Sequence, residues 1–349
     1  MAHRFRDQRL APPRRLPSVR LDLLMVRTSV VICLALAALG QSPGDPKTGE
    51  HRTTVSPLPG ENILLPCEYR MALPGTATTV KAAWIIFDRG QDYLKWFEDR
   101  QVRAFARQRA LALVLAAHCR SVEREDMIVE PRSGVGRSLF TALDQFAEST
   151  NRPELKAVGV IAMGWSGAGS LVARLAGYRP DRYLAAIAYA PGSYDPLGMD
   201  TIQLTAEAMA IPQLILANGG DKINGTARPH AYFRKYFEQG APWTFVVQNR
   251  APHCCLQNAQ TIILEWIDAV LLSEPGQTRL KSFGFLKVEL ADLLDEWKNP
   301  VFNATASRIS TRPTPKAGEL PSGWMPSPEF AREWLSFTGR KLPLAIWPP

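Results

Sequence analysis

The chain has 349 residues, of which 46% are hydrophobic and 21% are charged. This composition excludes a disordered or collagen-like protein and predicts a folded chain of one or two domains. The formal charge of +8 suggests a nucleic-acid or anionic-membrane partner, but only if the positive charge lies on the folded body.

The positive charge is concentrated at the amino terminus. Residues 1–40 hold seven arginines and two aspartates, a net +5, which leaves 8 − 5 = +3 for the rest of the chain. The apolar run 28–40 follows the arginines and ends in Ala38-Leu39-Gly40. This pattern is typical of a secretory signal peptide, and the run is shorter than the roughly 20 residues of a membrane span. We therefore expect a signal peptide over 1–40 and a secreted or periplasmic protein without a stable membrane anchor. An uncleaved anchor or a buried helix is the alternative, and Met25 is an alternative start.

Cysteine usage fits export. Removal of the leader leaves Cys67, Cys119, Cys254 and Cys255. An even number in an oxidising compartment predicts disulfides, although four cysteines allow three connectivities. Four buried thiols are the alternative. Because no CxxC spacing or His/Cys cluster points to zinc, we expect no metal and no cofactor.

Strand-like and helical segments alternate over 55–272, after a stretch interpreted as a linker over 41–54. The expected strands are 63–69, 80–87, 110–117, 156–163, 183–190, 212–218 and 243–248. The expected helices are about 92–107, 136–148, 167–176, 226–237 and 258–272. Pro66 would make the first strand an edge strand. Continuous apolarity, as in 157–163, indicates parallel strands covered on both faces. The pattern predicts a three-layer α/β domain with a mostly parallel central sheet flanked by helices.

Residues 273–349 are interpreted as a carboxyl-terminal appendage that packs on this core. The segment has an amphipathic helix candidate over Val288–Trp297 and a short helical segment around Ser327–Phe337. Its tryptophans need burial, and aromatic binding of a sugar or polymer is the alternative role for them: Trp297, Trp324, Trp334 and Trp347.

The segment Met163–Gly169 has the pattern of a nucleophile elbow. It reads MGWSGAG and joins an apolar strand to an apolar helix, with Gly164 and Ala168 two positions either side of Ser166. In such an elbow small residues let strand and helix pass closely, and the helix amino terminus directs N–H groups at an anion beside the serine. A glycine-rich turn with a structural serine is the alternative.

A base and an acid follow the serine in chain order. Asp221 comes after the strand 212–218, and His253 comes after the strand 243–248. Because the carboxyl ends of parallel strands meet at one edge of the sheet, we expect both to lie near Ser166.

Other histidines and aspartates are weaker candidates. His230 is expected on the surface of a helix, and His118 precedes the serine, which is the wrong order. Asp195 and Asp200 follow an earlier strand and stay alternative acids. Asp221 as a turn residue and His253 as a helix-entry residue are the structural alternatives.

Together these residues resemble the α/β-hydrolase fold, and within it secreted esterases related to feruloyl esterases and polyhydroxybutyrate depolymerases, over roughly 60–272. The resemblance implies a catalytic triad of Ser166, Asp221 and His253 that acts through an acyl-enzyme. The substrate it implies is a small-molecule or polymer-linked ester.

Two positions depart from that family. It has His-Gly after its third strand, where an N–H completes the oxyanion hole, whereas this chain offers Gly90 and Gln91, together with the Gly167 N–H. Ala168 replaces a glycine. A further hypothesis is a disulfide from Cys254 or Cys255 that anchors the histidine loop, with Cys119 as its partner.

The leading hypothesis is thus a secreted carboxylic-ester hydrolase. A serine peptidase or acyltransferase would share the triad, and the missing His-Gly favours a third possibility, a non-catalytic protein that binds a ligand in the same fold. A nucleic-acid partner is disfavoured because the densest arginine cluster lies in the leader and no RRM, KH or zinc-finger spacing is present.

Overall fold

The computed structural model describes residues 49–75, 78–87, 91–119, 130–192, 204–253, 259–272, 282–288, 302–317 and 319–339. The expected signal peptide lies outside these ranges. Within them, no helix combines the length and the hydropathy needed to cross a membrane.

A single mixed sheet forms the middle layer. The described residues contribute eleven strands, in the order β1-β2-β4-β3-β5-β6-β7-β8-β11-β9-β10. The central strands from β4 to β8 are parallel to one another, and the strands at both ends are antiparallel to their neighbours. The bounds are β1 Glu50–Val55, β2 Cys67–Ala72, β3 Ala82–Phe87, β4 Leu111–Ala117, β5 Gly159–Trp165, β6 Tyr183–Tyr189, β7 Gln213–Asn218, β8 Trp243–Gln248, β9 Phe283–Val288, β10 Phe302–Ser310 and β11 Glu319–Trp324.

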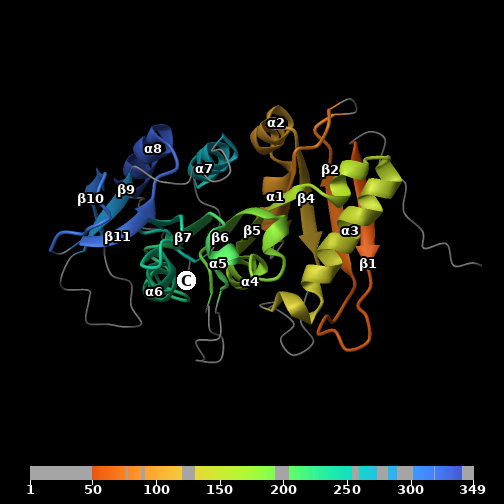
Figure 1. Ribbon diagram of the computed structural model, residues 1–349, viewed down its shortest axis with the longest axis horizontal. Helices are drawn as coiled ribbons and strands as arrows, with labels where there is room; N and C mark the ends of the chain where they lie inside the picture. The colour runs from red at the N-terminus through yellow and green to blue at the C-terminus, as the bar shows by residue number, and fades with distance from the viewer. Residues whose placement is uncertain are drawn as a thin grey trace, which may run out of the picture. The chain divides into compact units, whose positions relative to one another are not determined.

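Helices cover both faces of this sheet. Figure 1 shows α2, α7 and α8 along one side and α4 and α6 along the other. The α-helices are α1 Gln91–Glu98, α2 Arg100–Gln108, α3 Val135–Thr150, α4 Gly167–Leu175, α5 Ala206–Met209, α6 Ala227–Phe237, α7 Gln260–Leu272 and α8 Pro328–Gly339. Short 3₁₀ turns cover η1 Pro131–Ser133, η2 Pro153–Lys156 and η3 Pro180–Arg182. The expected three-layer α/β architecture with a mostly parallel central sheet is confirmed.

Continuous apolarity of the central strands corresponds to burial on both faces. In β3, Trp84 and Ile86 belong to the apolar cluster that includes α1, α2 and α7, whereas Ala83 and Ile85 belong to the cluster that includes α3 and α4. Successive side chains of a strand point to opposite faces, so a strand covered twice must be apolar at every position. At β3 the sheet therefore lies between two hydrophobic cores, whereas at β7 successive residues such as Leu214 and Ile215 both belong to the first cluster.

The amino-terminal end of the sheet differs from the prediction. Residues 50–55 form β1 and pair with β2, so the expected linker 41–54 contains most of a strand. Strand β2 begins at Cys67, directly after Pro66, and lies between β1 and β4. The edge-strand prediction is wrong because Pro66 lies outside the ladder, where its missing N–H costs no hydrogen bond.

The carboxyl-terminal segment extends the sheet. Strands β9, β10 and β11 belong to 273–349, and β11 pairs with β8 through Gly323 and Thr244. The expected boundary at 272 therefore falls inside one continuous sheet. The helix α8 agrees with the predicted segment around 327–337, and Trp324 and Trp334 are buried. Most of the helix candidate Val288–Trp297 lies outside the described residues; Val288 itself ends β9.

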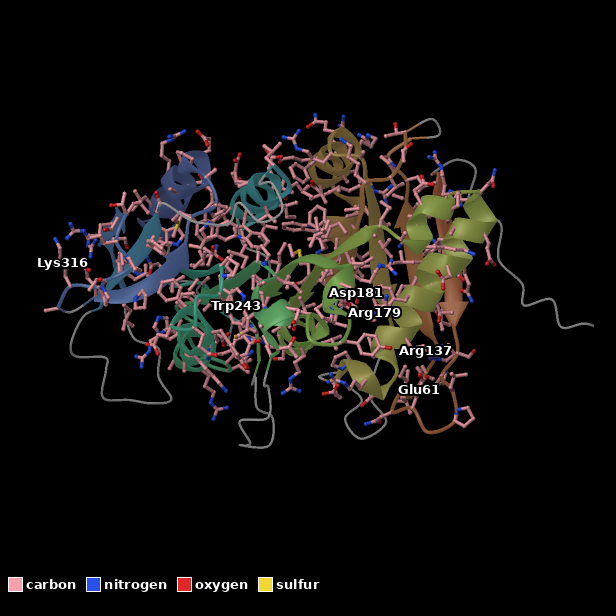
Figure 2. All side chains as sticks on the ribbon, in the orientation of Figure 1. Glu61, Arg137, Arg179, Asp181, Trp243 and Lys316 are labelled. Atoms are coloured by element: carbon pink, nitrogen blue, oxygen red, sulfur yellow. A yellow bond between two sulfur atoms is a disulfide. The ribbon has the colours of Figure 1, made fainter. Side chains whose placement is uncertain are left out.

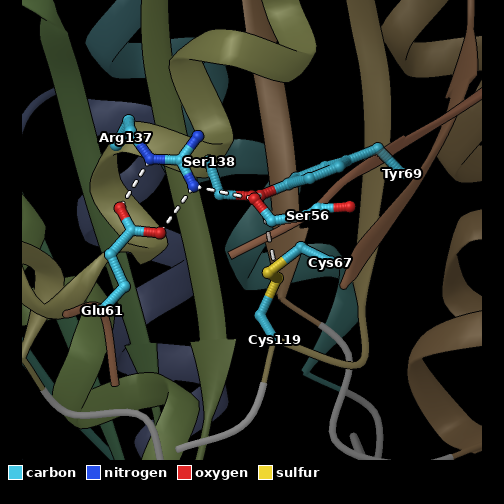
Figure 3. Close-up of a disulfide and its surroundings, with 7 residues drawn as sticks. All are labelled: Ser56, Glu61, Cys67, Tyr69, Cys119, Arg137 and Ser138. Carbon is cyan, nitrogen blue, oxygen red and sulfur yellow. Dashed lines mark hydrogen bonds and ion pairs between the residues drawn. A yellow bond between two sulfur atoms is a disulfide. The ribbon is translucent and has the colours of Figure 1, made fainter. Parts of the chain in front are cut away.

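A disulfide joins the start of β2 to the segment that directly follows β4. It links Cys67 to Cys119, with 4.6 Å between their Cα atoms (Figure 3). The hypothesis that Cys119 pairs with Cys254 or Cys255 is wrong, because antiparallel pairing of β2 and β4 brings Cys67 beside it first. Cys254 and Cys255 lie outside the described residues.

An ion pair fixes the neighbouring loop between β1 and β2. Arg137 Nη2 donates to Glu61 Oε2 at 2.6 Å and to the Ser56 carbonyl at 3.0 Å, and Glu61 and Arg137 lie together in Figure 2. The hydrogen bond from Arg137 is the main reason why the pKa of Glu61 is lowered. Loop and helix α3 are therefore held as one unit beside the disulfide (Figure 3).

Candidate active site

Ser166 occupies a strained turn between β5 and α4. Its backbone angles are φ 54° and ψ −121°, a combination that residues other than glycine rarely adopt. A Cβ placed on Gly164 would lie 2.4 Å from the Ala168 carbonyl oxygen, so only glycine fits there. The close approach of strand and helix is what the sequence pattern predicts for an elbow, and the alanine at 168 is accommodated in it.

Strand β6 and the loop that follows it hold this turn in place. The Ser166 N–H donates to the Tyr189 carbonyl at 3.0 Å, and the Gly192 N–H donates to the Ser166 carbonyl at 2.9 Å. Both partners belong to β6 or to the loop that follows it. The strained residue is therefore held by hydrogen bonds at both its N–H and its carbonyl, and such support from the surroundings is the condition for strain to persist.

Ser166, His253 and Asp221 form a continuous hydrogen-bonded chain. His253 Nε2 lies 3.0 Å from Ser166 Oγ, and His253 Nδ1 lies 2.7 Å from Asp221 Oδ2. Because a carboxylate oxygen accepts, Nδ1 carries the hydrogen and Nε2 is left as the acceptor for the serine hydroxyl. The imidazole is placed to take the Ser166 proton, and Asp221 is placed to stabilise the cation that forms.

The Asp221 side chain is fully buried and anchored by the backbone. Its second oxygen, Oδ1, accepts hydrogen bonds from the N–H groups of Ile223 at 2.8 Å and Asn224 at 2.9 Å. These two donors leave Oδ2 directed at the imidazole. His253 keeps 12% of its side chain exposed, so the acid is inaccessible while the base borders solvent.

The amino terminus of α4 lies next to Ser166. Gly167 is the first residue of that helix, so its N–H has no acceptor within the helix. Gln91 is the first residue of α1. This helix contacts the elbow, since Tyr93 stacks on Trp165 with ring centroids 6.3 Å apart. Gly90 lies outside the described residues. Gly167 thus has the position expected of an oxyanion-hole donor.

The competing histidines lie elsewhere. His230 is buried, not on a surface as predicted, and its Nε2 is 3.1 Å from the Pro321 carbonyl of β11. Burial lowers the pKa of His230 to about 4. The prediction failed because β11 covers the helix face that seemed free. His118 is exposed at the end of β4, and the alternative acids Asp195 and Asp200 lie outside the described residues.

Two residues near the triad escaped the sequence reasoning. Trp165 Nε1 donates to the His253 carbonyl at 2.9 Å, and Asn218 Nδ2 donates to the Pro252 carbonyl at 2.7 Å. The only signal for them in the sequence is their position. Trp165 directly precedes Ser166, and Asn218 ends the strand that leads to Asp221.

At the level of sequence, no protein-family model and no curated protein matches the chain. Solved structures do resemble it. A lidless α/β serine hydrolase from Xanthomonas campestris has 17% identity and a TM-score of 0.43, covering 67% of this chain and 100% of its own. An α/β-hydrolase enzyme from a Medee basin deep-sea metagenome has 13% identity and a TM-score of 0.47, covering 64% and 99%. A fluorophosphonate-binding serine hydrolase of Staphylococcus aureus has 10% identity and a TM-score of 0.42, covering 64% and 98%.

Because these TM-scores are below 0.5, the fold is assigned from the structure itself. The strand order, the parallel register and the strand–turn–helix at Ser166 define it. The fold is that of an α/β-hydrolase. In this hydrolase fold the elbow, the Asp221 turn and the His253 loop follow β5, β7 and β8 at the same edge of the sheet. The narrower resemblance to feruloyl esterases and polyhydroxybutyrate depolymerases is not confirmed and stays a prediction.

Proposed function

We propose that the protein is a secreted serine hydrolase that cleaves carboxylic esters through Ser166, His253 and Asp221. The observation that carries the proposal is the hydrogen-bonded chain from Ser166 Oγ through His253 to Asp221, with the serine on a strained turn. A structural serine has no need of such a turn, whereas a nucleophile must be held out toward its substrate.

In the proposed reaction, His253 takes the Ser166 proton as the hydroxyl attacks the ester carbonyl. The oxyanion that forms is stabilised by the Gly167 N–H and by a second donor from the start of α1, for which Gly90 and Gln91 are the candidates. His253 then protonates the leaving alcohol, and the acyl group stays on Ser166. A water activated by His253 releases the acid and restores the serine. No metal and no cofactor takes part in this scheme.

The substrate is proposed to be a small-molecule or polymer-linked ester. The same triad can serve peptide hydrolysis or acyl transfer, so the leaving group must be tested directly. Matched p-nitrophenyl ester and p-nitroanilide substrates with the same acyl group separate the two hydrolytic reactions. Faster turnover of the anilide would replace the ester proposal by a peptidase.

Export is supported by two features. The residues 28–40 have signal-peptide character, and the disulfide between Cys67 and Cys119 is of the kind that persists in oxidising compartments. Amino-terminal sequencing of the protein from the culture medium is expected to begin at Gln41. An uncut terminus on protein retained in the cytoplasm would contradict this part of the proposal.

The central test compares wild type with Ser166→Ala on p-nitrophenyl esters of several chain lengths. We expect at least a roughly 10⁴-fold loss of kcat in the variant, because the nucleophile is removed. Ser170→Ala is the matched control, since Ser170 is a buried serine one helical turn further on, and it should keep wild-type activity. A fluorophosphonate probe should label wild type and Ser170→Ala but not Ser166→Ala. Folded wild type that neither hydrolyses an ester nor takes the label would favour a binding protein.

A further inference from the structure

Three consecutive main-chain carbonyls in the histidine loop each accept a hydrogen bond from a different donor. They do so at 2.8, 2.7 and 2.9 Å, and the pairs are Gly220 N to Ala251 O, Asn218 Nδ2 to Pro252 O, and Trp165 Nε1 to His253 O. Loops are ordinarily more mobile than the elements they connect, so three protein donors to consecutive carbonyls restrict the path of this backbone.

The donors belong to the segments that carry the other two members of the triad. Trp165 directly precedes Ser166, and Asn218 ends the strand that leads to Asp221. The backbone of His253 is therefore tied to both groups that its imidazole must reach. Asn218 is fully buried, and its amide also lies 3.4 Å from the Tyr189 hydroxyl.

Trp165 contacts His253 a second time through its ring. The indole and imidazole centroids are 5.0 Å apart, with the planes inclined at 38°. Trp165 thus holds His253 in two places: a hydrogen bond fixes its main-chain carbonyl, and the indole packs against the imidazole ring. Rotation of the ring away from Ser166 would lose this packing.

We propose that Trp165 and Asn218 are positioning residues that fix His253 between Ser166 and Asp221. The inference rests on the proposed function for its catalytic consequence, but its structural content can be measured without activity. Their hydrogen bonds to the histidine loop go to main-chain carbonyls and not to Ser166 Oγ or His253 Nε2. Their role is to keep Nε2 at hydrogen-bond distance from Ser166 Oγ, where an error of about 1 Å can cost 10²-fold in rate.

Trp165→Phe keeps an aromatic ring and removes the donor. Its matched control is Trp243→Phe, because Trp243 Nε1 makes the same kind of bond, to the Ile211 carbonyl at 3.0 Å. Trp243 is fully buried, whereas Trp165 is half-buried, and Trp243 begins β8, at the edge of the sheet opposite His253; it is labelled in Figure 2. Loss of an indole-to-carbonyl bond is common to both variants, and the more buried Trp243 should lose at least as much stability, so a loss of kcat confined to Trp165→Phe reports its position beside His253.

On a p-nitrophenyl ester, Trp165→Phe should lower kcat by about 10- to 100-fold while KM changes by less than about two-fold. Asn218→Ala should lower kcat in the same sense, and it provides the test if Trp165→Phe does not fold. Trp243→Phe should keep the wild-type kcat. Wild-type kcat in folded Trp165→Phe and folded Asn218→Ala would overturn the proposal, as would an equal loss in Trp243→Phe.

The second measurement is the proton NMR signal of the His253 imidazole N–H in its bond to Asp221, identified by its absence in His253→Ala. We expect it to weaken or exchange faster in Trp165→Phe and to stay unchanged in Trp243→Phe. An unchanged signal in Trp165→Phe would overturn the positioning role. If wild type proves inactive on every ester, the proposed function fails, and this signal alone decides the inference.

Discussion

Replacing Asp221 with asparagine exchanges one oxygen for an amide nitrogen, and the surrounding backbone decides which way the amide points. The N–H groups of Ile223 and Asn224 donate to Oδ1. The amide oxygen of asparagine satisfies both donors, whereas its NH₂ group in that place would oppose two N–H groups. The substitution should therefore keep the turn intact and turn the NH₂ group toward His253.

An NH₂ group opposite Nδ1 reverses the tautomer of the His253 imidazole. Nδ1 must now accept, so Nε2 carries the hydrogen and can no longer take the proton of Ser166, 3.0 Å away. In serine proteases the equivalent change lowers kcat by about 10⁴-fold, which at 1.36 kcal/mol per tenfold is about 5 kcal/mol of transition-state stabilisation. We expect a loss of that order here, with little loss of folding stability.

The assay is steady-state hydrolysis of the best p-nitrophenyl ester, with urea unfolding in parallel. Asp268→Asn is the matched control, because Asp268 on α7 pairs with Arg109 at the carboxyl-terminal end of α2 and takes no part in the hydrogen-bonded chain of the triad. It should keep the wild-type kcat. If Asp221→Asn retained more than about a tenth of wild-type kcat, Asp221 would not set the tautomer of His253 and the triad assignment would be refuted.

Three further predictions concern the scaffold. Removing the disulfide by Cys67→Ala with Cys119→Ala should lower the free energy of unfolding by about 4 kcal/mol, given the 52-residue separation; equal urea midpoints for this variant and wild type would contradict it. Gly164→Ala should lower the thermal midpoint and slow fluorophosphonate labelling, because its Cβ would lie 2.4 Å from the Ala168 carbonyl oxygen. Overpacking of this kind costs roughly 1–3 kcal/mol of stability. Unchanged labelling would show that the elbow relaxes freely. Burial lowers the pKa of His230 to about 4 from 6.5, so its contribution to stability is present above pH 6.5 and is lost as the pH falls toward 4. The loss should reach about 3 kcal/mol in wild type and be absent in His230→Gln, measured by urea unfolding at several pH values.

The central sheet could be predicted because its signals are local. Strand β8 has the predicted bounds 243–248, and β7 differs by one residue. Both lie in apolar runs that end in turn residues. The elbow at Ser166 was also predictable, since its requirements fall within seven consecutive residues. Chain order and the shared edge of parallel strands then led to Asp221 and His253.

Features that depend on distant partners were missed. Strand β1 begins with Glu50, a residue type that seldom lies inside a protein, and it is buried here because Arg70 and Arg103 meet its carboxylate. Strand β11 reads ELPSGW, which resembles a turn by composition, and pairs with β9 and β8. The burial of His230 follows from that pairing. In each case the contact that decides the structure joins two segments far apart in the chain, and the residue pattern within either segment does not indicate its partner.

The attachment of β11 to β8 also has a consequence in time. A ribosome releases β8 well before it releases Glu319–Trp324, so the outer edge of β8 stays uncovered until β11 has emerged. Side chains then complete the junction, since Ser322 Oγ and Trp334 Nε1 both donate to the Phe245 carbonyl. An apolar strand with open N–H and C=O groups is a template for pairing with another chain. The arrival of β11 thus removes from the nascent molecule an edge at which it could pair with a neighbouring chain.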